Sequence, residues 1–326
     1  MRIVVTGGGG FIGAFLVKKL VKLGHDVVVI DNFLRGSLNR LKPIEDKITL
    51  INLDITKNFE TFQQETKNVD AVFHLAAVNG TENFYNHPSL VLDVGVYGIL
   101  NVLNAAEVNS IKKVIVASSA EVYQTAKKIP TDESAELIIP DPLEPRYSYA
   151  SSKIITEQLT LSYAHSGRVE SGIVFRPHNV YGPDMGTKHV VPQFILRAKD
   201  IRKKDYKNKF EIFGSGKETR AFCYVDDIVD GLIILLNSDE QKGIFHIGND
   251  HEISINELFS KLNTYFDNKL SKTHRDGAKG ATKRRCPSIS KMRNLGYEPK
   301  IDIDQGLKKT IEFYEDFNPD NDNPLL

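Results

Sequence analysis

The chain opens with Ile3-Val4-Val5-Thr6-Gly7-Gly8-Gly9-Gly10-Phe11-Ile12-Gly13, which joins an apolar run to a glycine-rich turn and the start of a helical pattern. At such a turn, free backbone N–H groups and the positive end of a helix meet, and both suit a pyrophosphate. Gly7 allows the tight turn, Gly10 allows backbone to approach phosphate, and Gly13 allows the helix to close on the sheet. The stretch therefore predicts a dinucleotide-binding site.

A carboxylate at the end of the second apolar run supports this interpretation. The run Asp26-Val27-Val28-Val29-Ile30 ends in Asp31, close to the ~20-residue distance from the glycines that dinucleotide sites show. Asp31 is placed to accept hydrogen bonds from the adenosine ribose, and its charge repels a 2′-phosphate. The sequence thus predicts NAD rather than NADP as the cofactor.

Apolar runs of strand length alternate with stretches of helical period, which indicates a parallel, doubly wound sheet. The predicted strands are 2–6, 26–31, 48–53, 70–76, 112–118 and 172–176, and the predicted helices are 11–24, 57–67, 88–108 and 148–166. Two isolated strands are expected at 210–213 and 243–247, and a frayed tail at 318–326. The predicted fold is α/β: a Rossmann-like domain over 1–176, then a smaller, mixed substrate-binding region over 177–326 from which some segments return to the first domain.

Composition excludes several classes of partner. The 326 residues include 42 Lys and Arg against 42 Asp and Glu, so no global basic field favours nucleic acid. With only Cys223 and Cys286, the chain fits a reducing compartment, and both thiols are expected to be packing residues. The glycine turn interrupts the apolar N-terminus, so we expect no signal peptide, no membrane span and a cytoplasmic location.

A second constellation points to proton transfer. Tyr149 and Lys153 are four residues apart, which places both on one face of a helix, where the ammonium and a positive nicotinamide would lower the pKa of the phenol. Ser119 ends a central strand, where doubly wound folds bind ligands. We expect Tyr149 to act as the base, Ser119 to polarise the same substrate oxygen, and Lys153 to tune Tyr149.

These residues resemble the NAD-dependent nucleotide-sugar epimerase/dehydratase family of the extended short-chain dehydrogenase/reductase superfamily. The resemblance covers nearly the whole chain. Besides the turn and the Ser119, Tyr149 and Lys153 set, it is carried by Asp31-Asn32-Phe33, Leu53-Asp54-Ile55, His74-Leu75-Ala76-Ala77, Ser118-Ser119-Ala120-Glu121-Val122-Tyr123, Arg176-Pro177-His178-Asn179-Val180-Tyr181-Gly182-Pro183, Thr219-Arg220-Ala221-Phe222-Cys223-Tyr224-Val225-Asp226-Asp227 and Leu295-Gly296-Tyr297-Glu298-Pro299.

The resemblance implies where the ligands bind. Its cofactor residues are Gly7, Gly10, Phe11, Ile12, Gly13, Asp31, Asn32, Asp54, Ile55, Leu75, Ala76, Ala77, Tyr149 and Lys153, with Asp54 and Ile55 at the adenine and Lys153 also on the nicotinamide ribose. Its ligands for the diphosphate of a nucleotide sugar are Asn179, Arg220 and Arg285, although Arg284 is an equally placed rival of Arg285. His74 is expected to be a buried structural imidazole, and no metal is expected.

The reaction type depends on the end of the strand at 112–118. By the resemblance, sugar 4,6-dehydratases carry Thr-Asp-Glu there and decarboxylases that form UDP-xylose carry Thr-Ser-Glu, whereas this chain has Ser119-Ala120-Glu121. Ala120 cannot protonate a leaving hydroxyl, which disfavours dehydration. The sequence predicts a nucleotide-sugar 4-epimerase; a decarboxylase, a 4,6-dehydratase, a 4-dehydrogenase and, more distantly, a non-catalytic NAD sensor remain as alternatives.

The resemblance also implies a homodimer. The helices at 93–108 and 148–166 carry apolar positions, among them Val94, Leu100, Leu103, Leu159 and Leu161, in excess of what one sheet face covers. A four-helix interface between two subunits would bury this surplus.

Overall fold

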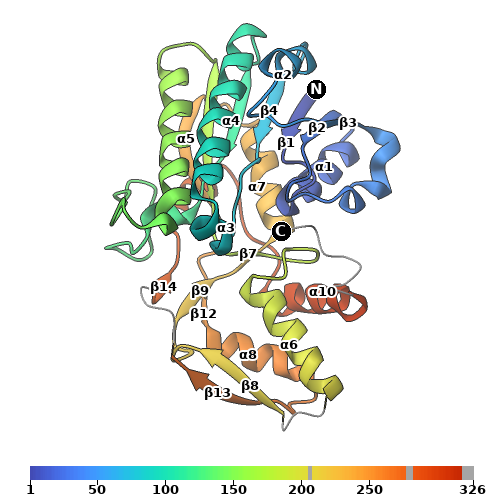
Figure 1. Ribbon diagram of the computed structural model, residues 1–326, viewed down its shortest axis with the longest axis vertical. Helices are drawn as coiled ribbons and strands as arrows, with labels where there is room; N and C mark the ends of the chain where they lie inside the picture. The colour runs from blue at the N-terminus through green and yellow to red at the C-terminus, as the bar shows by residue number, and fades with distance from the viewer. Residues whose placement is uncertain (205–207, 277–281, 318–326) are drawn as a thin grey trace.

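A seven-stranded sheet, parallel throughout, organises the larger part of the molecule (Figure 1). The computed structural model describes residues 1–204, 208–276 and 282–317, so the tail predicted to fray lies outside the described residues. The strands are β1 (Arg2–Thr6), β2 (Asp26–Asp31), β3 (Ile48–Asn52), β4 (Ala71–His74), β5 (Lys113–Ala117), β6 (Ser171–Pro177) and β11 (Lys242–Ile247). This sheet confirms the predicted Rossmann-like fold.

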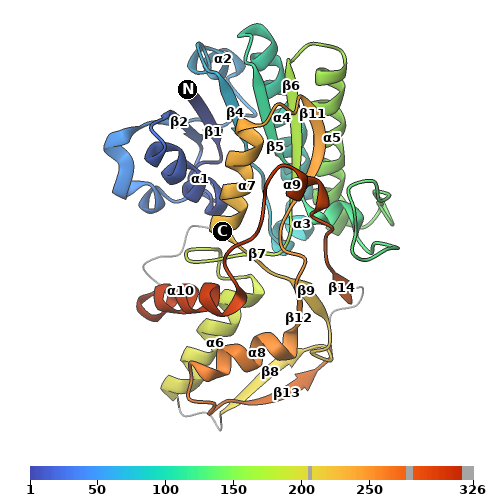
Figure 2. The same cartoon turned by 180° about the vertical axis from the view of Figure 1, so that it is seen from behind.

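Both faces of the sheet are covered because both faces of its strands are apolar. Ile3 and Val5 of β1 pack toward α1 (Phe11–Lys22) and α7 (Val225–Asn237), which lie in front in Figure 2. Val4, between them, points to the opposite face, where α2 (Phe59–Glu65), α4 (Pro88–Val108) and α5 (Ser148–His165) pack. This alternation is the two-residue period of a strand, and it explains why the first strands read as continuous apolar runs.

The strand order, β11-β6-β5-β4-β1-β2-β3, reverses direction at β1. From β1 the chain moves outward through β2 and β3, then returns to β4 on the other side of β1. At such a switch point the loops at the carboxyl ends of the strands diverge and leave a crevice for ligands. The glycine turn follows β1 at this crevice.

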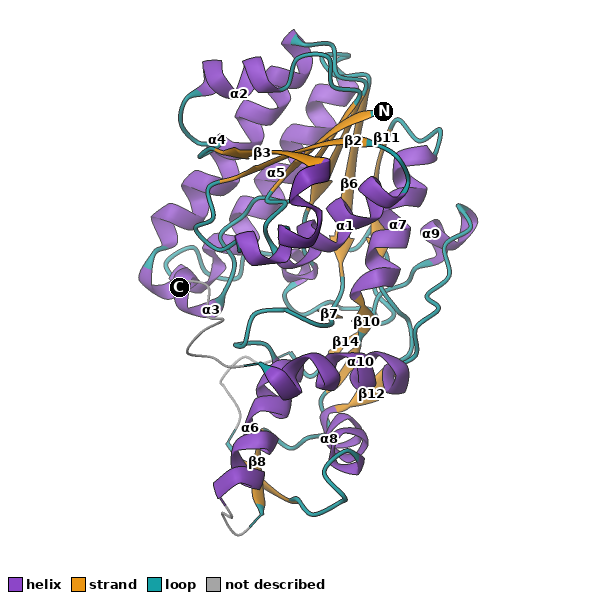
Figure 3. Ribbon diagram, turned by 90° about the vertical axis from the view of Figure 1, so that its right-hand side faces the viewer, coloured by secondary structure: helices purple, strands orange, loops and turns teal. Residues whose placement is uncertain are grey.

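A smaller region lies below the carboxyl edge of the sheet (Figure 3). It has its own apolar core and two small sheets, β12-β9-β14 and β13-β8. Its elements are α6 (Val190–Lys204), β8 (Lys209–Phe213), β9 (Thr219–Ala221), β12 (Glu252–Ser254), α8 (Ile255–Thr264), β13 (Ser271–Arg275), β14 (Arg284–Arg285) and α10 (Ile303–Asp316). Short linking elements are η1 (Leu38–Arg40), η2 (Lys42–Lys47), α3 (Thr81–Asn86), η3 (Ala120–Tyr123), η4 (Pro145–Tyr147), β7 (Val180–Tyr181), β10 (Cys223–Tyr224) and α9 (Ser290–Asn294).

Both strands expected to be isolated in the second half are paired, and the one at 210–213 belongs to β8, which pairs in parallel with β13. The strand expected to be isolated at 243–247 is instead β11, which pairs in parallel with β6 at the edge of the large sheet. Its last three residues, Phe245 to Ile247, are buried, and the strand packs against α7 and α9, so tertiary packing decides its place. Cys223 and Cys286 are buried and free, as predicted for packing residues.

Helix α4 is long and apolar enough to span a membrane by composition alone. In this molecule, however, it packs beside α5, and Ile99, Val102 and Leu103 are buried against the sheet, as in the core helix of a folded domain. Core helices commonly pass such a composition test. Because Leu103 is buried inside its own subunit, the expectation that it contributes to a subunit interface is wrong.

Candidate active site

The glycine turn forms a cradle that side chains would fill. Gly7 has a positive φ of 73°, and a Cβ on it would lie 2.7 Å from the backbone nitrogen of Ala76. A Cβ on Gly13 would lie 2.2 Å from the carbonyl oxygen of Gly7. Because the turn is this tight, backbone N–H groups at the start of α1 face the crevice without side chains in front of them. The turn therefore fits a pyrophosphate.

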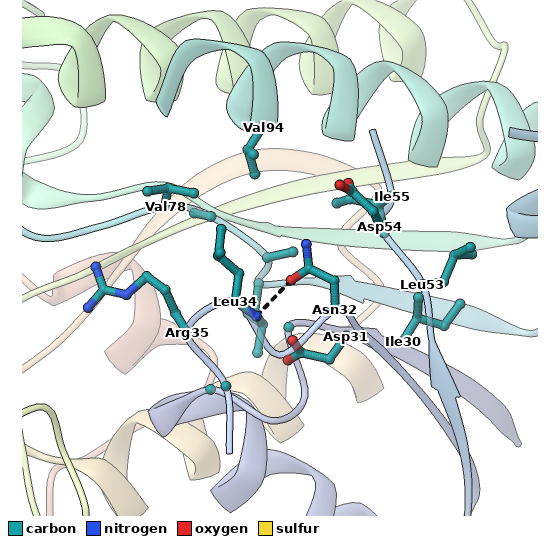
Figure 4. Close-up of a pocket in the computed structure, with 16 residues that line it drawn as sticks. Ile30, Asp31, Asn32, Leu34, Arg35, Leu53, Asp54, Ile55, Val78 and Val94 are labelled. Carbon is teal, nitrogen blue, oxygen red and sulfur yellow. Dashed lines mark hydrogen bonds between the residues drawn. The ribbon is translucent and has the colours of Figure 1, made fainter. Parts of the chain in front are cut away.

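Beside the turn lies a pocket lined by residues from the loops after β1, β2, β3 and β4 (Figure 4). Nine of the residues predicted to bind the cofactor line it: Gly7, Gly10, Asp31, Asn32, Asp54, Ile55, Leu75, Ala76 and Ala77. Phe11, Ile12, Gly13, Tyr149 and Lys153 do not line it. Phe11 and Ile12 instead pack into the two apolar cores on either side of α1.

Backbone and neighbouring hydroxyl groups hold the two carboxylates of this pocket. Asp31 accepts hydrogen bonds from the amides of Gly9, at 2.9 Å, and Phe33, at 2.8 Å. Burial raises the pKa of Asp31 above its ordinary value, and the two amides only partly offset this. Burial also acts on Asp54, but two hydrogen bonds from Thr56 outweigh it and hold the pKa of Asp54 below its ordinary value. Asp31 thus lies where a ribose hydroxyl of a dinucleotide is expected.

Tyr149 lies buried near the start of α5, with its ring stacked on Phe84 at 5.0 Å between centroids. Burial raises its pKa to about 12, against an opposing hydrogen bond from Ser119. This hydrogen bond brings together the two groups that the sequence expects to share one substrate oxygen. Ser119 and Arg35 are the groups that lower the pKa of the phenol here, and the effect expected of Lys153 together with the nicotinamide stays a prediction.

The ammonium of Lys153 lies beside the ring of Tyr149 and is hydrogen-bonded to the backbone. Its Nζ lies 5.8 Å from the centre of the Tyr149 ring but donates a hydrogen bond of 2.7 Å to the carbonyl of Ala117, at the end of β5. Burial lowers the pKa of Lys153 to about 8, and Glu157 opposes that shift. The strand that precedes Ser119 therefore holds the lysine. Because burial lowers its pKa, the lysine loses its proton at a lower pH than an exposed lysine does.

A buried ionic network behind these residues was not predicted. Arg176 and Glu157 form an ion pair of 2.6 Å with both side chains 1% exposed, and the hydroxyl of Ser118 donates to the same carboxylate. Arg176 also donates to Tyr123, whose hydroxyl lies 2.6 Å from Nε2 of His246. The network ties β5, α5, β6 and β11 together, so it positions Ser119 and Tyr149. An arginine inside the apolar run 172–176 is the one sequence signal for it.

The predicted diphosphate ligands lie on the other side of Ser119. Arg285 forms an ion pair of 2.6 Å with Glu121, two residues after Ser119. Arg220 is its register partner across the β9 and β14 pair, and burial together with the charge of Arg285 lowers the pKa of Arg220. Two guanidinium groups on neighbouring strands favour an anionic ligand, which would relieve their mutual repulsion.

The structure separates Arg284 from Arg285. Successive side chains of a strand point in opposite directions, and Arg284 pairs with Glu252 at 2.6 Å on the outer side of β14. Asn179 has a positive φ of 42° and donates through its amide to the carbonyl of Ala221, next to Arg220. Asn179, Arg220 and Arg285 thus occupy one region, and Arg284 lies outside it.

His74 is a structural residue, as predicted. It is 1% exposed, lies 2.8 Å from the hydroxyl of Thr6 through Nδ1, and burial lowers its pKa to about 3. Within residues 1–204, 208–276 and 282–317, no three His, Cys, Asp or Glu side chains form a group suited to a metal ion.

Comparison with known proteins identifies relatives over the full length of the chain. The model of the NAD-dependent epimerase/dehydratase family matches residues 3–248. A UDP-N-acetyl-alpha-D-glucosaminuronate decarboxylase of Bacillus cytotoxicus is 31% identical, covering 98% of this chain and 99% of its own.

Two solved structures show the same arrangement with different chemistry. UDP-glucose 4-epimerase of Thermotoga maritima, solved with UDP-glucose, has a TM-score of 0.85 and 28% identity, covering 97% of this chain and 99% of its own. A dTDP-glucose 4,6-dehydratase of Streptomyces venezuelae, solved with NAD, has a TM-score of 0.85 and 26% identity, covering 100% of both chains. Epimerases, dehydratases and decarboxylases are therefore all among the similar proteins.

Proposed function

Because the chain belongs to the NAD-dependent epimerase/dehydratase family, we propose that it is a nucleotide-sugar 4-epimerase, which oxidises the sugar transiently at C4 and reduces it from the opposite face. When bound, NAD supplies the hydride acceptor and donor for this chemistry. The observation that carries the proposal is the end of β5. There, Ala120 offers no acid group, and the carboxylate of Glu121 is paired with Arg285 rather than free to act on a substrate.

The remaining polar groups suit a reaction at one hydroxyl. Tyr149 takes the proton of the 4-hydroxyl and returns it, while Ser119 holds the same oxygen. The hydrogen bond from Ser119 and, to a smaller extent, the charge of Arg35 lower the pKa of the Tyr149 phenol, against burial, which has the largest effect, and the charge of Glu121, which both raise it. Arg220 and Arg285 bind the diphosphate, which leaves the sugar free to turn between the two hydride transfers.

Product analysis tests the proposal. The protein is incubated with UDP-glucose, UDP-N-acetylglucosamine, UDP-glucuronic acid and dTDP-glucose, and the products are read by NMR and mass spectrometry. We expect a 4-epimer of unchanged mass from at least one of them, and we expect Glu121→Gln to lower turnover less than Tyr149→Phe does. Loss of carbon dioxide or formation of a 6-deoxy-4-keto sugar, abolished by Glu121→Gln, would overturn the epimerase.

A decarboxylase is the second candidate, favoured by Glu121 itself. The residue occupies the glutamate position of the Thr-Ser-Glu pattern, and the relative from Bacillus cytotoxicus is named a decarboxylase. Such an enzyme needs a carboxylate at C6 of its sugar. Conversion of UDP-glucuronic acid alone, with loss of carbon dioxide, would establish this second candidate.

We also propose that the chain forms a homodimer through α4 and α5. These helices pack side by side and expose Leu90, Tyr97 and Ile155, which are 37%, 56% and 39% exposed. Burial of these side chains in a four-helix interface would remove apolar surface from water. Light scattering at micromolar concentration should report twice the chain mass, and Tyr97→Glu should shift it toward the monomer. A monomeric wild type would overturn the dimer.

A further inference from the structure

One charged side chain of the cofactor pocket, Arg35, has no ligand assigned to it. Of the described residues that line the pocket, Arg35 alone carries a positive charge, against the carboxylates of Asp31 and Asp54. Arg35 is half-buried, and its Nη1 is buried without a hydrogen-bond partner in the described part of the chain. A buried guanidinium nitrogen without a hydrogen-bond partner is costly, so its position favours an anionic ligand.

The strand order determines where this guanidinium lies. β1 is flanked by β2 on one side and β4 on the other. Arg35 belongs to the loop after β2, and its Nη1 reaches Gly80 in the loop after β4, where an added Cβ would lie only 2.9 Å away. The side chain therefore crosses the carboxyl end of β1, where the glycine turn begins.

The backbone beside Arg35 also contacts that turn. A Cβ on Gly36 would lie 3.0 Å from the carbonyl carbon of Gly9, and the amide of Ser37 donates a hydrogen bond of 2.9 Å to the carbonyl oxygen of Gly9. The loop that carries Arg35 is thus fixed directly on the turn that presents backbone N–H groups.

From this arrangement we infer that Arg35 binds the pyrophosphate of the dinucleotide and completes, with its charge, a site that the glycine turn begins with backbone amides. An arginine fork matches two phosphate oxygens at once, which a helix N-terminus alone does not. The two carboxylates repel such an anion, and Arg35 offsets them.

The direction of the side chain argues against another anion. An arginine that follows the second strand can also serve the 2′-phosphate of NADP, beside the adenosine ribose. In Figure 4, however, Arg35 extends to the end of the pocket where Val78 lies, away from Asp31 and Asp54. The ribose end of the pocket therefore keeps its acidic character, and the guanidinium group lies at the opposite end of the pocket.

Calorimetry on protein freed of co-purified nucleotide tests the inference. The ligands are NAD, ADP-ribose and adenosine, of which the first two carry the pyrophosphate and the third does not. We expect Arg35→Met to weaken binding of NAD and ADP-ribose about 10- to 100-fold, the range for a lost charged hydrogen bond, and to leave adenosine within about twofold. Arg35→Lys should recover part of the loss because it restores the charge without the fork.

Two further measurements guard against a merely structural effect. Arg275→Met removes an exposed arginine, paired with Glu211 far from the pocket, and should leave all three affinities unchanged. Raising the salt concentration should weaken NAD binding more in the wild type than in Arg35→Met, since screening acts on the lost charge. Circular dichroism checks that each variant is folded.

The inference fails under any of three outcomes. Unchanged affinity of Arg35→Met for NAD and ADP-ribose would show that no phosphate contact was lost. Equal weakening of adenosine would show a change of pocket shape. NADP and UDP are titrated in the same way, and selective weakening of either would assign the arginine to the 2′-phosphate or to the substrate instead. All of these readouts are independent of whether the enzyme is an epimerase.

Discussion

The two sides of the site are built in different ways. On the cofactor side, a turn of four glycines, Gly7 to Gly10, joins β1 to α1 and presents backbone amides, and Asp31 lies only 18 residues beyond the last glycine of the motif, Gly13. On the substrate side, side chains from positions 121, 179, 220 and 285 meet at two short strands. A backbone cradle depends on local geometry, whereas a side-chain cluster depends on the whole fold. The first is therefore readable from a short motif, and the second is not.

The largest expected effect lies between the two sides, at Tyr149. Tyr149→Phe removes one hydroxyl and should lower turnover by at least about 10²-fold, the scale of general acid–base catalysis. The melting temperature and the Kd for NAD should stay near those of the wild type, because the ring and its stacking on Phe84 remain. Turnover close to that of the wild type would show that the base is another group.

The substrate side is sharpened by comparing two adjacent arginines. Arg285→Met should weaken the tightest binder among UDP, dTDP, GDP and CDP about 10- to 100-fold, because a charged hydrogen bond to phosphate is lost. Arg284→Met is the matched control and should change the affinity less than about twofold, since Arg284 pairs with Glu252 on the outer side. Isothermal titration gives both values. Equal losses of affinity in the two variants would mean that the opposite directions of the two side chains do not decide which arginine binds the diphosphate.

The cofactor side is tested at Asp31. Asp31→Ser removes a negative charge from the position expected to face the ribose, so the ratio of the Kd for NADP to that for NAD should fall at least about tenfold, since like-charge repulsion costs several kcal/mol. Both values come from titration of the nucleotide-free protein. If the wild type binds NAD and NADP with equal affinity, the assignment of Asp31 to the ribose is wrong.

The smallest effect concerns stability and pH. The unfolded chain keeps the Lys153 proton up to the ordinary pKa of 10.5, whereas the folded protein releases it near 8. Unfolding therefore takes up a proton between these values, so this residue makes the free energy of unfolding rise with pH there. From pH 8 to 9.5, the wild type should gain on the order of 2 kcal/mol relative to Lys153→Met in urea titrations. If the free energy of unfolding depends on pH in the same way in the wild type and in Lys153→Met, the pKa of Lys153 is not lowered by burial.

Much of the fold follows from local pattern. The bounds of β1, β2 and α4 agree with the strands and the helix predicted at 2–6, 26–31 and 88–108. These segments are apolar on the faces that they bury, and glycine, proline or aspartate marks their ends. The prediction of an isolated strand at 243–247 was wrong because a short strand pattern fits an isolated strand as well as the edge of a sheet. Only the pairing with β6 decides between the two.

By itself the sequence determined the glycine cradle, the carboxylate of Asp31, the shared helix face of Tyr149 and Lys153, and the family. Each of these rests on residues close in the chain, whose geometry the backbone sets locally. Only the tertiary structure decided that Arg285 rather than Arg284 faces Glu121, that Arg176 and Glu157 brace the strand end before Ser119, and that Arg35 reaches Gly80 in the loop after β4. Those pairings join residues 19 to 164 positions apart, and their contacts exist only once the sheet order has brought the strand ends together.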